Sequence, residues 1–172
     1  MRVFAAPASK NRDNIAARDV LRAMLAEAFA RTGRHGEAAT LVNVMPLDCD
    51  YCLRVRGLAA AFAGRPAEAD HWLGELARRT PSLPIAHEAW AEAKLFRRDY
   101  AGAIREAAAA HAVGPRWAEP LKHWGDALAA RGKWSDAAAK YALALERAPN
   151  WAALQRAHVS ANRQGTKPMS LG

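Results

Sequence analysis

The sequence is poor in the residues that build β-sheets. Valine, isoleucine and threonine are scarce, and aromatic residues make up only 8% of the 172-residue chain. Strands favour these β-branched and aromatic types, and no strand-like run of them is present. The composition therefore excludes a β-sandwich and a parallel-sheet enzyme.

Long apolar runs are absent as well. No stretch of about 18 apolar residues occurs, so we expect no membrane insertion. Residues 1–10 carry Arg2 but no apolar stretch behind it, unlike a secretory signal. Two cysteines in a chain of this size do not make a disulfide scaffold. We therefore expect a cytoplasmic protein.

Catalytic signatures are also missing. The sequence has no P-loop, no G-x-G-x-x-G, no H-E-x-x-H and no G-x-S-x-G motif. A metal or base site needs converging ligands, and the histidines are dispersed along the chain: His35, His71, His87, His111, His123 and His158. We expect neither an enzyme nor a cofactor.

Alanine is what the chain has in excess. Roughly a quarter of the residues are alanine, the best helix former. With 51% hydrophobic residues the chain can bury a core, and its length suits one domain. Composition thus predicts an all-α fold whose helices approach closely.

Residues recur along the chain with a spacing of 34. Pro81, Pro115 and Pro149 are equally spaced by this step. Three further sets keep it: Leu83, Trp117 and Trp151; Ala69, Ala103 and Ala137; and Ala59, Ala93 and Ala127. A period shared by four independent positions indicates an internal structural repeat.

The clearest copy of the repeat reads Leu121-x2-Trp124-Gly125-x2-Leu128, then Ala137-x3-Tyr141 and Pro149. Earlier copies start at Arg22, Leu53 and His87, and the first is cut short at Met45-Pro46. The period and the pattern are those of the tetratricopeptide repeat (TPR). The chain therefore resembles a TPR protein over about four repeats, from Asp19 to Asn150.

This resemblance implies a right-handed α-solenoid of antiparallel helix pairs. We expect one domain over residues 12–163, with flexible ends at 1–11 and 164–172. The repeats are expected at about 19–49, 50–83, 84–117 and 118–151, with a capping helix at 151–163. Helices are predicted at 12–32, 35–45, 50–63, 66–79, 84–97, 100–113, 118–131, 134–147 and 151–163. The irregular first repeat suggests a segment of a longer bacterial protein.

Small residues mark two kinds of position in each repeat. Gly57 and Gly125 stand midway along the first helix of a pair, where the two helices approach closely. Gly33, Gly64 and Gly132 stand at the turn between the helices, where a left-handed C-cap is needed. Arg98 occupies the matching place in the third copy, where we expect mild backbone strain.

TPR proteins bind peptides in a concave groove lined by the first helices, and the resemblance assigns candidate residues to it. We expect Tyr51, Phe62, Leu95 and Phe96 to be anchors and Glu88, Glu92 and Lys122 to steer register; alternatively, Phe62 and Phe96 only pack onto the next repeat. The predicted partner-binding residues are Tyr51, Arg54, Leu58, Phe62, Glu88, Glu92, Leu95, Phe96, Lys122 and Asp126. Further lining residues are Met24, Glu27, Arg31, Ile85, Glu119, His123 and Arg156.

Some chaperone-binding TPR domains clamp a carboxylate terminus with lysine and asparagine at fixed positions. Here the asparagine positions hold Glu27, Leu58, Glu92 and Asp126. This departure argues against a C-terminal carboxylate as the ligand.

Cys49 and Cys52 form a C-x-x-C pair at the start of the second repeat. Such a pair can be redox-active or supply half of a zinc site. Neither a thioredoxin-like context nor a second C-x-x-C accompanies it, so packing in the linker is the main interpretation. Redox chemistry and metal binding stay open.

The net charge of +8 suggests a second kind of partner. By repeat phase, seven arginines fall outside the groove: Arg65, Arg78, Arg79, Arg97, Arg98, Arg105 and Arg147. Such a basic convex face could bind nucleic acid or an anionic surface, although no stacking platform accompanies it and nucleic acid is not the favoured partner. Self-association as a homo-oligomer is a further alternative.

Overall fold

The computed structural model describes residues 8–166, with side chains from residue 17 onward. This part of the chain is all-α. Its helices are α1 (Ala8–Arg31), α2 (His35–Asn43), α3 (Asp50–Phe62), α4 (Pro66–Arg79), α5 (Ile85–Phe96), α6 (Tyr100–Val113), α7 (Ala118–Ala130), α8 (Trp134–Leu145) and α9 (Ala152–Gly165). None of the described helices is long and apolar enough to cross a membrane.

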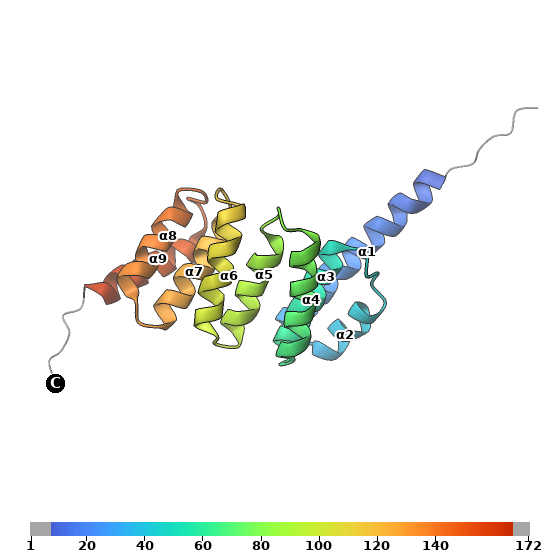
Figure 1. Cartoon of the computed structure of the whole chain (residues 1–172), viewed down its shortest axis with the longest axis horizontal. Coiled ribbons are helices and arrows are strands. Elements are labelled where there is room, and N and C mark those ends of the chain that lie inside the picture. Colours follow the sequence, from blue (N-terminus) through green and yellow to red (C-terminus); the bar gives the residue numbers. More distant parts are fainter. Residues whose placement is uncertain (1–7, 167–172) are drawn as a thin grey trace, which may run out of the picture.

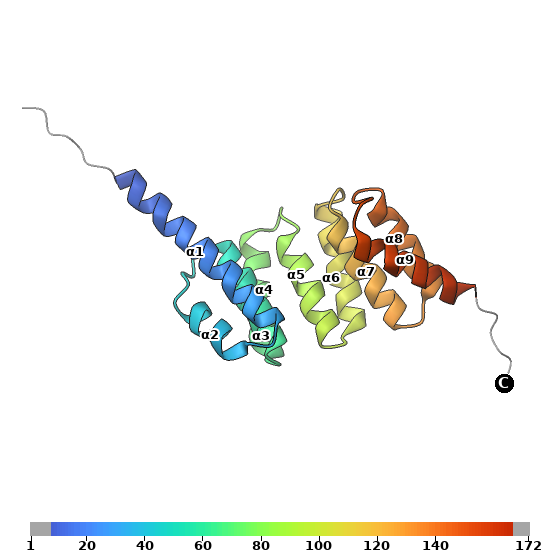
Figure 2. The ribbon, with the colours of Figure 1, turned by 180° about the vertical axis from the view of Figure 1, so that it is seen from behind.

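The helices form an α-solenoid, as the repeat predicts. Consecutive helices pair as α1/α2, α3/α4, α5/α6 and α7/α8, and α9 packs on α8 at the end. They follow one another along the long axis of the molecule in chain order, from α1 at one end to α9 at the other (Figure 1). The beginning of α1 extends beyond its partner α2 (Figure 2).

The turn between the two helices of each repeat uses a left-handed residue, as predicted. Gly33, Gly64 and Gly132 have φ angles of 80°, 73° and 73°. Arg98 takes the same role with φ 62°, the sole positive φ at a non-glycine position in the described chain. Because a side chain is disfavoured in this conformation, the third repeat carries the expected strain.

The glycines of the first helices lie at the helix crossings. A Cβ atom built on Gly57 would stand 2.4 Å from Cγ of Leu73, and one on Gly125 would stand 2.4 Å from Cε1 of Tyr141. These positions therefore make room for a large side chain of the second helix. Leu73 and Tyr141 are in turn fully or almost fully buried.

Two of the expected ends differ from the structure. Helix α1 begins at Ala8, inside the segment 1–11 expected to be flexible, because no proline or glycine interrupts the chain between Pro7 and Arg31. Helix α9 continues to Gly165, beyond the predicted end at 163. Residues 1–7 and 167–172 of the two expected tails lie outside the described residues.

The irregular first repeat has its own closing contact. Arg56 stands where the best copy has tryptophan, and its side chain is buried. Its Nη2 donates to the carbonyl oxygen of Met45 at 2.6 Å, and its guanidinium lies 5.2 Å from the ring centre of Trp72. The buried arginine thus satisfies the Met45 carbonyl at the early end of the first repeat, while its own Nε has no hydrogen-bond partner.

Candidate binding groove

The predicted groove residues come from α1, α3, α5 and α7, the first helices of the four repeats. Each of these helices packs against the next one of the set. Side chains at intervals of three or four residues share one face of a helix, which puts Glu27 beside Arg31 and Glu88 beside Glu92. Charged side chains from all four helices therefore meet along one face.

Glu27 is the centre of the charges at the α1 end. Its carboxylate accepts from Arg31 Nη2 at 2.8 Å, from Arg54 Nη1 at 2.8 Å and from the Tyr51 hydroxyl at 3.2 Å. Burial alone would raise the pKa of Glu27, but Arg54 and Arg31 outweigh it and lower this pKa. Glu27 is thus a fixed anion that positions two arginines.

Arg31 also donates to Glu92 with both of its terminal nitrogens, Nη1 and Nη2, and Nη2 lies 2.9 Å from Oε2. The hydrogen bonds that Arg31 donates to Glu92 raise the pKa of Arg31, against the opposing effect of burial. The two-pronged geometry is the one in which arginine binds carboxylates most specifically. The pair links α1 to α5 across α3.

Glu88 is almost completely buried, unlike the partly exposed Arg31 and Glu92. Its Oε1 is 3.1 Å from Nε2 of His123 on α7, and its Oε2 is 3.6 Å from Nη2 of Arg54. We call Glu27, Arg31, Arg54, Glu88, Glu92 and His123 the groove network. It connects all four first helices through ionisable side chains.

An aromatic pair borders the groove network. The rings of Phe62 and Phe96 pack edge to face with centres 5.0 Å apart. Arg31 lies 5.4 Å from the centre of the Phe62 ring, within cation–π range. Phe62 is half-buried, whereas Phe96 is 55% exposed. The sequence left packing and binding open for both residues; the two rings pack on each other, and the binding role stays a prediction.

Two cavities share the aromatic pair as a common wall. One, of about 270 Å³, lies toward α1 and includes Arg31 and His35; the other, of about 380 Å³, lies toward α7 and includes Lys122 and Asp126. Leu95 lines the second cavity. The predicted anchors Phe62, Leu95 and Phe96 therefore lie together at a hollow surface.

Lys122 and Asp126 form a pair at the α7 end. Lys122 Nζ lies 2.6 Å from Asp126 Oδ2, and the buried Tyr141 hydroxyl donates to Asp126 Oδ1 at 2.8 Å. Burial and the Asp126 charge raise the pKa of Tyr141, which therefore stays a hydroxyl donor. Lys122 also lies 5.8 Å from the ring centre of Trp151.

The prediction for Leu58 is wrong. Its side chain is fully buried and packs in a core cluster with Ala69, Leu73 and Ala89 instead of lining the groove. Leu58 follows Gly57, the residue that allows Leu73 to approach α3 closely. The helix face that carries Leu58 is therefore sealed by α4 and α5.

Cys49 and Cys52 are joined by a disulfide bond. Cys49 is also the N-cap of α3, and its sulfur lies 3.1 Å from the backbone nitrogen of Cys52. The bond leaves neither sulfur free as a thiolate ligand, so the bridged pair is not a metal site. The redox interpretation stays a prediction.

Ion pairs neutralise much of the expected basic convex face. Acidic neighbours pair with five of the seven arginines: Arg65 with Glu68, Arg78 and Arg79 with Glu75, Arg97 with Asp70, and Arg147 with Glu146. Local pairing weakens the positive potential that nucleic-acid binding needs.

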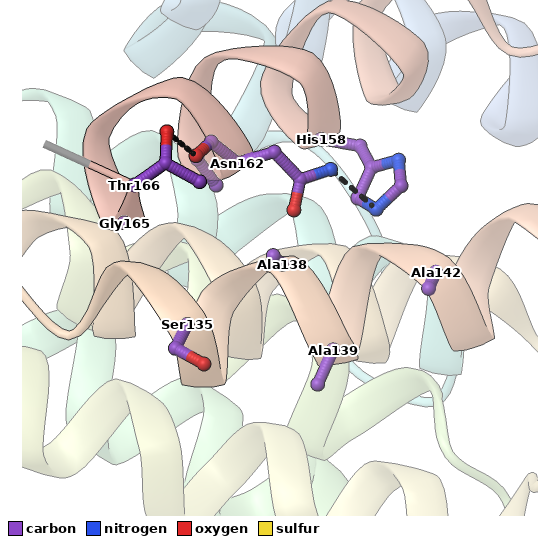
Figure 3. Close-up of a pocket in the computed structure, with 9 residues that line it drawn as sticks. Ser135, Ala138, Ala139, Ala142, His158, Asn162, Gly165 and Thr166 are labelled. Carbon is purple, nitrogen blue, oxygen red and sulfur yellow. Dashed lines mark hydrogen bonds between the residues drawn. The ribbon is translucent and has the colours of Figure 1, made fainter.

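A separate hollow lies between α8 and α9, with a volume of about 390 Å³. Its lining from α8 is mostly small, with Ala138, Ala139 and Ala142. The side chains of His158 and Asn162 on α9 lie across from Ala138 (Figure 3). The amide nitrogen of Asn162 lies 3.1 Å from Nε2 of His158. These groups are exposed, and they do not converge on a common point as a catalytic or metal site would require.

Sequence reasoning did not foresee which groove residues bind one another. Glu27, Arg31 and His123 appear in the predicted lining, but nothing in their spacing shows that Arg31 meets Glu92, 61 residues away. The histidines looked dispersed, yet the repeat brings His123 to Glu88, 35 residues away. The sequence did contain one indication of this contact, because the 35 residues between Glu88 and His123 are close to one repeat period of 34.

No family model and no curated protein sequence matches this chain. Among solved structures, the first TPR domain of human RPAP3 is 20% identical, with a TM-score of 0.63 over 67% of this chain and 91% of that one. MamA AMB-1 is 19% identical, with a TM-score of 0.57 over 87% and 84%. The TPR domain of Arabidopsis OM64 is 17% identical, with a TM-score of 0.60 over 66% and 94%. At these identities the likeness establishes the fold: the chain has the α-solenoid fold of TPR domains, as its repeat predicts.

Proposed function

We propose that this TPR solenoid is a protein–protein interaction scaffold that binds a peptide segment of a partner protein in its groove. The scaffold catalyses no reaction itself. Its helices are fixed by packing before the partner arrives, so little conformational entropy is lost on binding by the solenoid.

The exposure of Phe96 beside two cavities is the observation that carries this proposal. A large aromatic side chain that is 55% exposed forms one wall of two adjoining cavities. Exposed apolar groups in a hollow, surrounded by charged residues, are typical of recognition sites. An apolar partner side chain that enters beside Phe96 would cover the ring and serve as the main anchor.

The charges around the aromatic pair restrict the partner further. Glu92 and Asp126 replace the asparagines of a carboxylate clamp, and Arg31 and Lys122 are already paired to them. A free C-terminal carboxylate would therefore meet acids and occupied cations. This supports an internal peptide segment with an apolar anchor as the ligand.

Peptide selection tests this proposal directly. A displayed library of random peptides is selected on the wild-type protein, and binders are measured on wild type and on Phe96→Ala. We expect the selected peptides to share an apolar anchor and to bind Phe96→Ala at least tenfold more weakly, the loss of about 1.4 kcal/mol typical of an interface anchor.

Leu143→Ala is the matched control. Leu143 is 39% exposed but lies on α8, a second helix outside the groove. The Leu143→Ala variant should bind the selected peptides as wild type does. Peptides that bind wild type and Phe96→Ala equally well would contradict the proposal. Phe62→Ala is less useful, because Phe62 is half-buried and its loss also weakens the core.

Self-association is the second candidate function, and the exposed face of α1 supports it. Val20, Leu21, Met24 and Leu25 are 43–66% exposed on neighbouring turns of this helix. The outer face of α9 carries polar Gln155, Arg156 and Arg163 instead, as the end of a solenoid usually does. Leu21→Glu should abolish any concentration-dependent increase in mass measured by light scattering.

We also propose that the protein is cytoplasmic, as expected from the sequence. In a reducing compartment the Cys49–Cys52 bond would exchange with cellular thiols. Thiol titration of the protein isolated under thiol-trapping conditions would report whether the Cys49–Cys52 bond is present.

Convex-face binding to nucleic acid is less well supported, because the arginines there are largely paired.

A further inference from the structure

Three potential metal ligands converge in the groove network. Glu88 and Glu92 lie one turn apart on α5, and His123 faces them from α7. Their ligand atoms all lie within 4.8 Å of one another, which makes them the one His/Cys/Asp/Glu cluster of this kind in the described part of the chain. These residues come from two helices that pack side by side, so the backbone holds the group together.

Two of these side chains have buried polar atoms without a hydrogen bond. Glu88 has a side chain only 5% exposed, and its Oε2 accepts no hydrogen bond. Nδ1 of His123 is also buried and without a partner. Buried polar atoms are nearly always satisfied, and an exception such as Glu88 Oε2 calls for an explanation such as a bound ion. An ion at Nε2 of His123 would leave Nδ1 unpartnered, so Nδ1 does not itself point to the ion. The ion pair with Arg54 at 3.6 Å compensates the Glu88 charge only in part.

The spacing of the donors fits a small divalent cation. Ligands at zinc-binding distances in a tetrahedral arrangement are about 3.3 Å apart, and Glu88 Oε1 lies 3.1 Å from His123 Nε2. One imidazole and two carboxylates are a donor set that zinc accepts. We propose that Glu88, Glu92 and His123 form a zinc-binding site in the groove, independent of any peptide ligand.

Arg31 competes with the metal for Glu92. Its guanidinium binds both carboxylate oxygens of Glu92, so a zinc ion has to draw Glu92 away from Arg31 and toward Glu88. The unpartnered Nδ1 also leaves the imidazole without the outer hydrogen bond that strengthens most histidine ligands. We therefore expect weaker zinc binding than at a site whose three ligands are free and supported by outer hydrogen bonds.

Metal titration of the full chain tests the proposal. The tag-free protein is kept oxidised, with the absence of free thiols checked, so that Cys49 and Cys52 offer no ligands. Zinc is titrated by calorimetry up to about 100 μM, and Co²⁺ is added as a spectroscopic probe of donor geometry. We expect one zinc ion per chain and a visible Co²⁺ spectrum of low coordination number.

Variants of two of the three ligands and one matched control variant locate the site. Glu88→Gln and His123→Gln should each weaken zinc binding more than tenfold, since even outer-shell partners contribute 10- to 100-fold. His87→Gln is the control: His87 lies 2.9 Å from Glu106 in a similar pair that lacks a third ligand. It should bind zinc as wild type does. Circular dichroism checks that each variant is folded.

Arg31→Gln gives a result in the opposite direction. Releasing Glu92 from a partly exposed ion pair should tighten zinc binding about 1.4- to fivefold, the equivalent of the 0.2–1 kcal/mol that such pairs contribute. Any of three results would overturn the site: no zinc binding by the oxidised wild type, equal loss in His87→Gln and His123→Gln, or weaker binding by Arg31→Gln.

Discussion

Arg31 on α1 binds Glu92 on α5 across the intervening repeat, with Nη2 and Oε2 2.9 Å apart. In a solenoid each repeat contacts mainly its neighbours, and the described backbones of α1 and α5 do not pack against each other. Side chains thus join the first repeat to the third on the groove side. The pair is partly exposed, at 41% for Arg31 and 18% for Glu92.

A double-mutant cycle on this pair should reveal coupling between the two repeats. We expect Arg31→Gln and Glu92→Gln to destabilise the fold non-additively, with a coupling energy of about 0.5–1 kcal/mol that decreases in high salt. Urea unfolding of the four proteins measures it. Strictly additive effects would mean that the contact contributes nothing to stability.

Glu27 should make stability depend on pH in the acid range. Its pKa in the folded protein lies below the ordinary value of 4.5, so the unfolded chain binds the proton more readily. The contribution of Glu27 is therefore complete above about pH 4.5 and is lost as the pH falls through the folded-state pKa. We expect the stability difference between wild type and Glu27→Gln to be largest at neutral pH and to shrink below pH 4.5. A difference that stays constant down to pH 3 would contradict this assignment.

Gly125→Ala should destabilise the protein by about 1–3 kcal/mol, because the new methyl group overlaps the Tyr141 ring. Gly74→Ala is a matched control inside α4, where the nearest atom to a new Cβ is 3.5 Å away. There alanine only improves helix propensity, and we expect a gain of about 0.5–1 kcal/mol. Thermal unfolding compares the two, and equal effects would rule out the packing argument.

Arg98→Gly should stabilise the third repeat by about 0.5–1 kcal/mol, because glycine adopts φ 62° without steric cost. The reciprocal change Gly132→Ala places a side chain at φ 73° and should destabilise by about 1 kcal/mol. Both positions are exposed, so packing changes little. Chemical denaturation checks the signs, and a destabilised Arg98→Gly would show that Arg98 makes a compensating contact.

The sequence predicted the fold in detail because each repeat follows the same local rules. A 34-residue period places a left-handed turn at Gly64, Arg98 and Gly132, and the glycine at position 33 marks the matching turn of the shorter first repeat; all four positions have positive φ. It placed Leu58 wrongly, because helical phase shows which residues share a face but not how far a neighbouring helix covers it. Helix α1 also began earlier than predicted, since no sequence signal marks its start.

The sequence by itself thus determined the repeat, the helices and the turns between them, because these depend on local periodicity and turn chemistry. Only the tertiary structure decided which of these side chains meet. Arg31 contacts Glu92 and His123 contacts Glu88 because the stacking of repeats brings residues distant in sequence within hydrogen-bonding distance. That stacking depends on packing between helices, and it makes a groove network from charges that look dispersed along the chain.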